Sequence, residues 1–417
     1  MSILIKNILI GETEKDIHIT GGEIKAIDKN LSVDADETID GRGKAAIPSF
    51  MNGHTHAAMV LMRGLADDML LHEWLEKAVW PFEANLTEDD VYWGTRLACL
   101  EMIKTGTTFF NDMYWYYHGV ARAVEDAGIR AAVSAVFIDM FDDSKADEQI
   151  AMNQDLFEET TRYSSRISFA LGPHALYTVS EKSLLWATKF AMEHGIMIHT
   201  HISETQTEVE DCIRRTGKRP VEYLHEIGFL DANVIAAHVI WVNDREIDLL
   251  REHDVTIVYN PTSNMKLSAG IFPYSKLKKA GLRIVLGTDG CASNNNLDML
   301  EEMKFASLLQ KLNEGDPSML PAEEVFDLAT VSPAHTFNYD LGELKPGQSA
   351  DLLLVNLQDV HLNPRHQLIA DLVYSAQGSC IDTTICDGMI LMRDGVVEGE
   401  EEVLQQAGSV AEKLAHR

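Results

Sequence analysis

Two histidines separated by one residue, His54 and His56, follow the apolar stretch 45–53. In a β-strand, residues i and i+2 point to the same side, so the two imidazoles can reach one metal ion. The same spacing on a solvated edge would make them ordinary surface residues. A metal site is therefore a hypothesis that depends on further ligands elsewhere in the chain.

Other side chains suited to metal binding and proton transfer follow short apolar segments. The segments 169–173, 196–198, 234–237 and 284–288 each end close to such a residue. Those residues are His174, His199, His201, Glu204, His238 and Asp289. Catalytic side chains gather where the strands of a parallel barrel end. The repetition indicates a single catalytic site better than it indicates several unrelated structural histidines.

The middle of the chain, residues 50–344, alternates apolar segments with segments of helix-forming residues. The expected strands after the first are 107–112, 129–137, 167–171, 196–200, 234–237, 256–259 and 284–286. Repeated strand–helix units of this number predict an α/β fold with a parallel, TIM-like (β/α)₈ barrel. A doubly wound parallel sheet is the alternative.

Both ends of the chain predict short antiparallel strands. Residues 2–48 contain β-prone segments separated by glycine-containing turns, and a matching pattern returns after residue 345. Neither end can bury a core by itself. We therefore expect residues 1–49 and 345–417 to form one small β-sandwich domain beside a barrel domain at 50–344.

The composition is that of a globular protein of 417 residues, of which 46% are hydrophobic. A formal net charge of −30 repels phosphate backbones and anionic membranes, so we expect neither a nucleic-acid polymer nor a membrane as partner. No segment reaches the roughly 18 apolar residues of a membrane span, and no signal sequence is recognised. Five scattered cysteines without a Cys-x-x-Cys pair indicate reduced thiols and a cytoplasmic location. The sequence leaves open whether the chain forms a homo-oligomer.

The motifs and their order resemble the amidohydrolase superfamily and, within it, the branch of 5-methylthioadenosine and S-adenosylhomocysteine deaminases. The resemblance covers essentially the whole chain. It rests on the segments 47–56, 80–83, 172–175, 201–205, 237–238, 260–267 and 286–290.

The resemblance implies one divalent metal, most often zinc, with iron or manganese as alternatives. Its ligands would be His54, His56, His201 and Asp289, which leave a position for a water molecule whose pKa the metal lowers. The segment 167–179 contains no lysine, and a carboxylated lysine is what bridges the metals of many binuclear members. A mononuclear site is therefore expected.

The resemblance also assigns the catalytic roles. Glu204 would carry a proton from the water to a ring nitrogen, His238 would contact the attacking oxygen, and Asp289 would help to deprotonate the water. His199 and His201 have the same i, i+2 spacing as His54 and His56. From spacing alone, either of them could be the metal ligand. Only the position of Glu204 favours His201, and His199 is then a supporting or structural residue.

The implied reaction is hydrolytic deamination of an adenine nucleoside at its 6-amino group. Glu83 would bind the ribose hydroxyls, His174 would touch the nucleoside, and Trp74 would pack against base or sugar, although a helix aromatic also suits a protein core. Glu204 and Asp289 would contact the reacting ring.

The preferred nucleoside depends on a position in the third expected barrel strand. Ala135 stands where relatives that accept S-adenosylhomocysteine are expected to carry an arginine for its carboxylate. We therefore predict that adenosine, 5'-deoxyadenosine and methylthioadenosine are better substrates than S-adenosylhomocysteine. Two alternatives remain open: the same chemistry on guanine, a pterin or a triazine, as in a guanine deaminase or a chlorohydrolase, and a barrel scaffold that has lost its chemistry.

Overall fold

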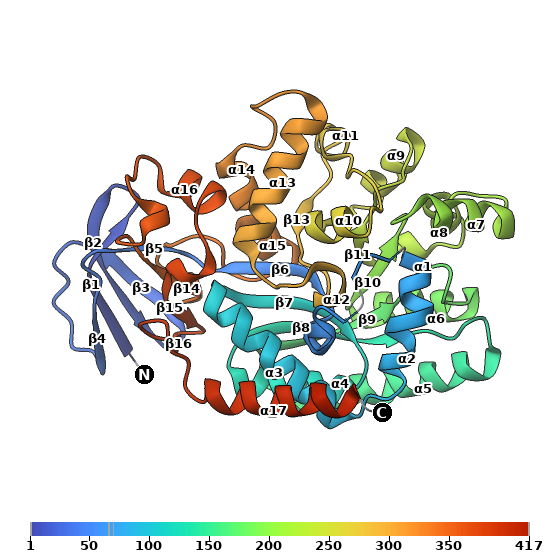
Figure 1. The fold of residues 1–417 in the computed structure, drawn as a ribbon, viewed down its shortest axis with the longest axis horizontal. Coiled ribbons are helices and arrows are strands. Elements are labelled where there is room, and N and C mark those ends of the chain that lie inside the picture. Colours follow the sequence, from blue (N-terminus) through green and yellow to red (C-terminus); the bar gives the residue numbers. More distant parts are fainter. Residues whose placement is uncertain (1, 66, 70, 416–417) are drawn as a thin grey trace.

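A computed structural model describes residues 2–65, 67–69 and 71–415. Its centre is a nearly closed barrel of eight parallel strands in the order β13-β12-β11-β10-β9-β8-β7-β6 (Figure 1). The strands are β6 (Phe50–Thr55), β7 (Thr107–Tyr114), β8 (Arg130–Phe137), β9 (Ile167–Pro173), β10 (Met197–Ile202), β11 (Asn233–His238), β12 (Thr256–Tyr259) and β13 (Ile284–Leu286). The predicted parallel barrel is confirmed.

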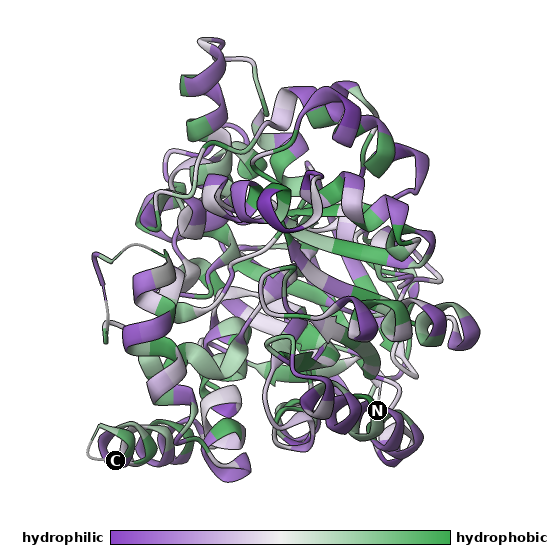
Figure 2. Cartoon of the chain, turned by 90° about the vertical axis from the view of Figure 1, so that its right-hand side faces the viewer, coloured by the Kyte–Doolittle hydropathy of each residue, from purple (hydrophilic) through white to green (hydrophobic). Residues whose placement is uncertain are grey.

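Helices surround this barrel and bury the outer faces of its strands. The longer ones are α3 (Glu88–Thr105), α4 (Tyr117–Ala127), α5 (Asp143–Glu159), α6 (Glu181–His194), α7 (Gln206–Thr216), α9 (Asp244–Glu252), α13 (Met299–Glu314) and α17 (Glu400–Leu414). The shorter ones are α8 (Pro220–Glu226), α10 (Pro261–Lys266), α11 (Tyr274–Lys279), α12 (Cys291–Asn294), α14 (Ala322–Asp327), α15 (Val331–Thr336), α16 (Leu368–Tyr374), η3 (Thr160–Arg162), η4 (Phe229–Asp231), η5 (Val360–Leu362) and η6 (Gly378–Cys380). Figure 2 shows mostly hydrophobic residues on the central strands, and hydrophilic residues alternating with hydrophobic ones on the outer helices. Among the described residues, no helix is both long and apolar enough to cross a membrane.

The two ends of the chain form a second, mixed sheet of eight strands beside the barrel. Its strands are β1 (Ser2–Ile10), β2 (Thr13–Thr20), β3 (Glu23–Asp28), β4 (Glu37–Asp40), β5 (Lys44–Pro48), β14 (Leu352–Asn356), β15 (Ile381–Cys386) and β16 (Met389–Met392). Antiparallel pairing of β5 with β14 joins the N-terminal and C-terminal strands. The predicted association of both chain ends is therefore confirmed, and it takes the form of a single mixed sheet.

The boundary between the two parts is crossed by helices and by a buried ion pair. Helices α16 and α17 follow the first C-terminal strand but pack on helices of the barrel, α17 along α3 (Figure 1). Arg130, at the start of β8, donates to Asp351 at 3.0 Å and to Asp387 at 2.9 Å. The domain limits at residues 49 and 345 stay a prediction, because the packing mixes the two parts.

The segment after β6 covers the carboxyl ends of the barrel strands, where a barrel enzyme has its site. It contains the 3₁₀ helix η1 (Ala57–Met62), and then α1 (Leu71–Trp74), η2 (Leu75–Val79) and α2 (Trp80–Glu83) in direct succession. The middle piece, η2, is a π-helical turn, a feature that often accompanies functional sites. This helical segment carries Trp74 and Glu83 to the barrel mouth.

Candidate metal centre and catalytic cavity

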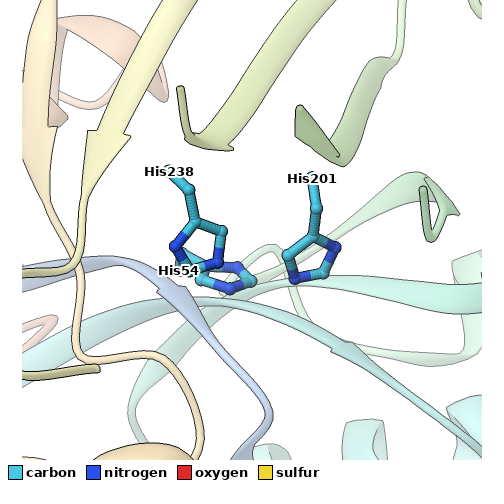
Figure 3. Close-up of side chains that lie close together, drawn as sticks. All are labelled: His54, His201 and His238. Atoms are coloured by element: carbon cyan, nitrogen blue, oxygen red, sulfur yellow. The ribbon is translucent and has the colours of Figure 1, made fainter. Parts of the chain in front are cut away.

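Three histidines from three different barrel strands point toward one another at the end of the barrel. They are His54 of β6, His201 of β10 and His238 of β11 (Figure 3). Each offers a ring nitrogen, and these atoms lie within 4.8 Å of one another. A second group with the same spacing contains His54, His56 and Asp289. Because His54 belongs to both groups, the predicted ligands and His238 form one buried cluster.

The cluster has the donor set of a catalytic metal site. His54 Nε2 and His56 Nε2 each lie 3.3 Å from Asp289 Oδ1. The Nδ1 atoms of His56 and His201 point away from the cluster, toward the carbonyl oxygens of Met113 at 2.6 Å and His174 at 2.8 Å. A ring that donates through Nδ1 keeps its Nε2 lone pair for a metal. Imidazole and carboxylate ligands suit a divalent transition metal.

Asp289 is held in place by its backbone and by three donors. Its φ of 61° lies in the left-handed region, and its N–H donates to the carbonyl of His54 at 3.0 Å, which ties β13 to β6. The Oδ2 atom accepts from Ser263 at 2.6 Å and Ser293 at 2.9 Å, and Oδ1 accepts from Gly290 N. Burial alone would raise the pKa of Asp289, but the neighbouring histidines hold it well below its usual range. The carboxyl group is therefore ionised and oriented.

Glycine at position 287 allows the close approach that closes the barrel. A Cβ atom there would lie 2.8 Å from the backbone nitrogen of His54 and 2.6 Å from Asn260 Oδ1. Cβ atoms in proteins essentially never lie this close to other heavy atoms, so any other residue at position 287 would push β13 away from β6. The position of Asp289 relative to His54 depends on this contact.

Glu204 sits in the turn that ends β10, and a second glutamate fixes that turn. Ser203 has a positive φ of 53°, and the carboxylate of Glu208 accepts from Ser203 N at 2.9 Å and from Glu204 N at 2.8 Å. Glu204 Oε1 lies 3.9 Å from His238 Nε2. The buried Glu204 carboxylate therefore stands beside the metal cluster.

His238 lies between two carboxylates and is oriented by an amide. Its Nε2 is 3.9 Å from Glu204 and 4.0 Å from Asp289 Oδ2, and its Nδ1 is 2.9 Å from Asn264 Oδ1. Burial lowers the pKa of His238, but the carboxylates of Glu204 and Asp289 raise it by more, so that it ends above its usual value. The ring can offer a hydrogen bond at the mouth of the cluster.

A cavity at the end of the barrel opens onto this cluster. Its polar wall includes His56, His174, His201, Glu204, His238, Asp289 and Glu83, and its apolar wall includes Trp74, Trp80, Val136, Ile138, Tyr177 and Leu267. Among the described residues that line it there is no lysine and no arginine. This mixed lining suits a small molecule with an aromatic ring and a few polar groups.

Glu83 faces this cavity from the end of α2. Its Oε2 atom accepts from Trp115 Nε1 at 3.0 Å, and burial raises the pKa of Glu83. His174, at the end of β9, also lines the cavity, and its Nδ1 lies 2.8 Å from Thr178 Oγ1. Trp74 lines the cavity too, and its side chain is otherwise buried in the core.

A model of the amidohydrolase family matches residues 45–391, from the last N-terminal strand through the barrel to β16. The chain belongs to the amidohydrolase family. The resemblance predicted from the motifs is thereby confirmed. Family membership and the histidine cluster together support a divalent metal in this amidohydrolase.

Two relatives are each 47% identical to this amidohydrolase. The 5-methylthioadenosine/S-adenosylhomocysteine deaminase 1 of Archaeoglobus fulgidus covers 99% of this chain and 99% of its own length. The 5'-deoxyadenosine deaminase of Methanoregula boonei covers 100% of this chain and 96% of its own length. A solved structure of an adenosine deaminase from Xanthomonas campestris with bound zinc has a TM-score of 0.93 and 30% identity, and covers 100% of this chain and 99% of that one.

The structure brings the predicted site residues of this amidohydrolase together but corrects one position. Position 135 was predicted to face the substrate, with alanine in place of the arginine of some relatives. The side chain of Ala135 instead packs in the core outside the barrel. The next residue, Val136, and Ile138 line the cavity instead. Because β8 is buried on both faces, its sequence does not show which residues point inward. The cavity wall itself, without lysine or arginine, is the better evidence on charge.

Several supporting residues were not singled out from the sequence as parts of the site. Glu208 holds the turn of Glu204, Trp115 donates to Glu83, and Tyr177 lines the cavity. Glu208 lies in the first turn of α7, where carboxylates are favoured, and this position could have suggested the contact with the preceding backbone. Trp115 and Tyr177 gave no comparable signal, because single aromatic residues mostly belong to cores.

Proposed function

We propose that this amidohydrolase is a metal-dependent hydrolytic deaminase, which replaces the 6-amino group of an adenine nucleoside with oxygen and releases ammonia. The observation that carries the proposal is the convergence of His54, His56, His201 and Asp289 beside Glu204 at the end of one cavity. Relatives at 47% identity that are named as deaminases of such nucleosides support the substrate class.

The proposed ligands are His54, His56, His201 and Asp289, and the proposed metal is zinc, with iron or manganese as alternatives. The zinc in the adenosine deaminase of Xanthomonas campestris supports this choice. Bound there, the ion would act as a Lewis acid that lowers the pKa of a water molecule.

The protein side chains would then move the protons. Glu204 takes a proton from the attacking water and gives it to a ring nitrogen, which makes C6 more electrophilic. His238 and Asp289 hold the attacking oxygen by hydrogen bonds. The C6–O bond forms, the C6–N bond breaks, and the second water proton leaves with the amino group as ammonia.

An ammonia-release screen of the metal-loaded protein tests this proposal. The substrates are adenine nucleosides, free purine bases, pterins and triazines at equal concentration. We expect release from adenine nucleosides and little from the others. Release only from a free base, a pterin or a triazine would reassign the substrate, and no release from any of them would favour a non-catalytic scaffold.

Replacing Glu83 by glutamine should lower kcat/KM for adenine nucleosides by about 10- to 100-fold. The proposed reason is that the Glu83 carboxylate accepts hydrogen bonds from the ribose hydroxyls, and such charged hydrogen bonds contribute about 1.5–3 kcal/mol. Glutamine keeps an oxygen that can accept from Trp115 Nε1, so the fold should persist. Steady-state kinetics with adenosine and with adenine as the free base provide the measurement.

The matched control is Glu73→Gln, a change on the same helical segment at an exposed residue that is ion-paired with Lys77. It should leave kcat/KM unchanged. If Glu83→Gln slows any turnover of adenine as strongly as that of adenosine, Glu83 does not bind ribose.

Neutral nucleosides should exceed S-adenosylhomocysteine in kcat/KM by at least about tenfold. The described cavity wall presents the carboxylates of Glu83, Glu204 and Asp289 but no lysine or arginine. A substrate carboxylate would therefore lose its hydration without gaining an ionic hydrogen bond, which costs at least about 1.4 kcal/mol. Kinetics with 5'-deoxyadenosine, methylthioadenosine and S-adenosylhomocysteine measure the ratio.

The methyl ester of S-adenosylhomocysteine is the matched control substrate, since it has nearly the same length without the carboxylate charge. Its kcat/KM should lie closer to that of methylthioadenosine. Equal values for S-adenosylhomocysteine and the neutral nucleosides would contradict the prediction.

We also propose a cytoplasmic location for this amidohydrolase. The five cysteines are buried and form no disulfide bond with one another. Free thiols are usual in a reducing compartment. Assembly into a homo-oligomer remains a further proposal, which size-exclusion chromatography with light scattering would test.

A further inference from the structure

His54 differs from the other proposed histidine ligands in the group that holds its second ring nitrogen. His56 and His201 each point Nδ1 toward a backbone carbonyl. His54 Nδ1 instead lies 2.7 Å from Nε2 of another histidine, His199 of β10. Both rings are fully buried, with centroids 4.8 Å apart and planes nearly perpendicular at 88°.

The direction of this hydrogen bond follows from the chemistry of the two rings. His54 Nε2 is buried without a hydrogen bond of standard geometry and faces Asp289 Oδ1, so it is the nitrogen that faces the metal. A nitrogen that binds a metal uses its lone pair, and the ring proton must then sit on Nδ1. Nδ1 can donate only if His199 Nε2 accepts.

His199 must itself hold its proton on Nδ1 in order to accept at Nε2. Nδ1, the other nitrogen of the His199 ring, is buried. A proton on Nδ1 leaves the Nε2 lone pair of His199 available to accept from His54 Nδ1, 2.7 Å away.

We propose that His199 is a positioning residue, which fixes the proton and the ring orientation of His54 so that Nε2 faces the metal. The inference rests on the proposed function, because it needs His54 as a ligand. It also explains the two histidines on β10: His201 binds the metal, and His199, two residues earlier on the same face, orients a ligand on β6. His199 itself belongs to neither described group that could hold an ion.

Substitution can test this role, because the acceptor is a side chain and not a backbone carbonyl. His199→Leu removes the acceptor, whereas His199→Gln can place an amide oxygen near the position of Nε2. We expect His199→Leu to weaken zinc binding by about 10- to 100-fold, as for other groups that orient ligands. The zinc affinity of His199→Gln should stay within about threefold of the wild type, because its amide oxygen can still accept from His54 Nδ1. Competition with a chromophoric chelator measures the zinc affinity.

Two further measurements separate positioning from packing. Ile235→Ala changes a buried residue of β11 that is paired with His199 in the sheet register, and it removes no hydrogen bond to His54. It should lower the Tm of the metal-free protein without changing zinc affinity. The visible spectrum of the Co²⁺-loaded protein should shift in His199→Leu but not in His199→Gln. If His199→Leu does not fold, His199→Met, whose thioether is a weak acceptor, takes its place.

Unchanged zinc affinity in His199→Leu would overturn the inference while leaving the metal centre intact. Equal losses in His199→Leu, His199→Gln and Ile235→Ala would also overturn it, because packing alone would then explain the effect. A wild-type protein that binds no zinc, iron or manganese would overturn both this inference and the proposed function.

Discussion

Replacing Glu204 by glutamine is expected to lower kcat for adenine nucleosides by about 10²- to 10⁴-fold, the usual contribution of a positioned acid–base group. Glutamine has nearly the same shape but cannot accept the water proton and pass it on. Glu204 is not a proposed metal ligand, so the metal content should stay at one ion per chain. Ammonia release under saturating substrate, together with elemental analysis, measures both quantities.

Glu210→Gln is the matched control for this change. Glu210 lies on α7 in the same segment, is exposed, and accepts only a surface hydrogen bond from Gln206 in the described structure. It should retain full kcat. A Glu204→Gln enzyme with wild-type kcat would move the proton-transfer role to Asp289, the other carboxylate beside His238.

The barrel could be predicted from the sequence because its strands are buried on both faces. Such strands appear as continuous apolar runs, and the expected segments 256–259 and 284–286 agree with β12 and β13. The run that begins at residue 45 was harder to interpret, because it contributes to two sheets: β5 pairs with β14, whereas β6 begins at Phe50 and belongs to the barrel. Composition does not change at that junction, so only the tertiary pairing reveals it.

The site was predictable as a set of residues but not as a set of oriented atoms. Strand ends converge in a parallel barrel, and this rule alone relates His54, His201 and Asp289 across the chain. Which ring nitrogen of each histidine faces the metal depends on the partner of the other nitrogen. That partner is a carbonyl for His56 and the His199 side chain for His54, and neither contact follows from residue spacing.

Replacing His54 and His56 together by alanine should remove the metal and lower activity by at least about 10³-fold. A metal stabilises the transition state of such a hydrolysis by several kcal/mol, and each 1.36 kcal/mol corresponds to a factor of ten. Burial lowers the pKa of His54 to about 4, so this ligand is unprotonated and ready to bind at neutral pH. Zinc should therefore raise the Tm of the wild type but not of the variant. Zinc at about 1,000 times its Kd stabilises a protein by about 4 kcal/mol.

The matched control for the loss of two histidines is the pair His225 and His253, which lies away from the described cavity wall. The Nδ1 atom of His225 is 2.9 Å from the Nε2 atom of His253. Their double replacement by alanine should leave the metal content, the zinc-dependent rise in Tm and the kcat unchanged. This control separates loss of the metal centre from the general cost of removing two imidazoles. If the His54→Ala/His56→Ala protein kept one tightly bound ion per chain, the ion would lie elsewhere, and the ligand set proposed for this amidohydrolase would be wrong.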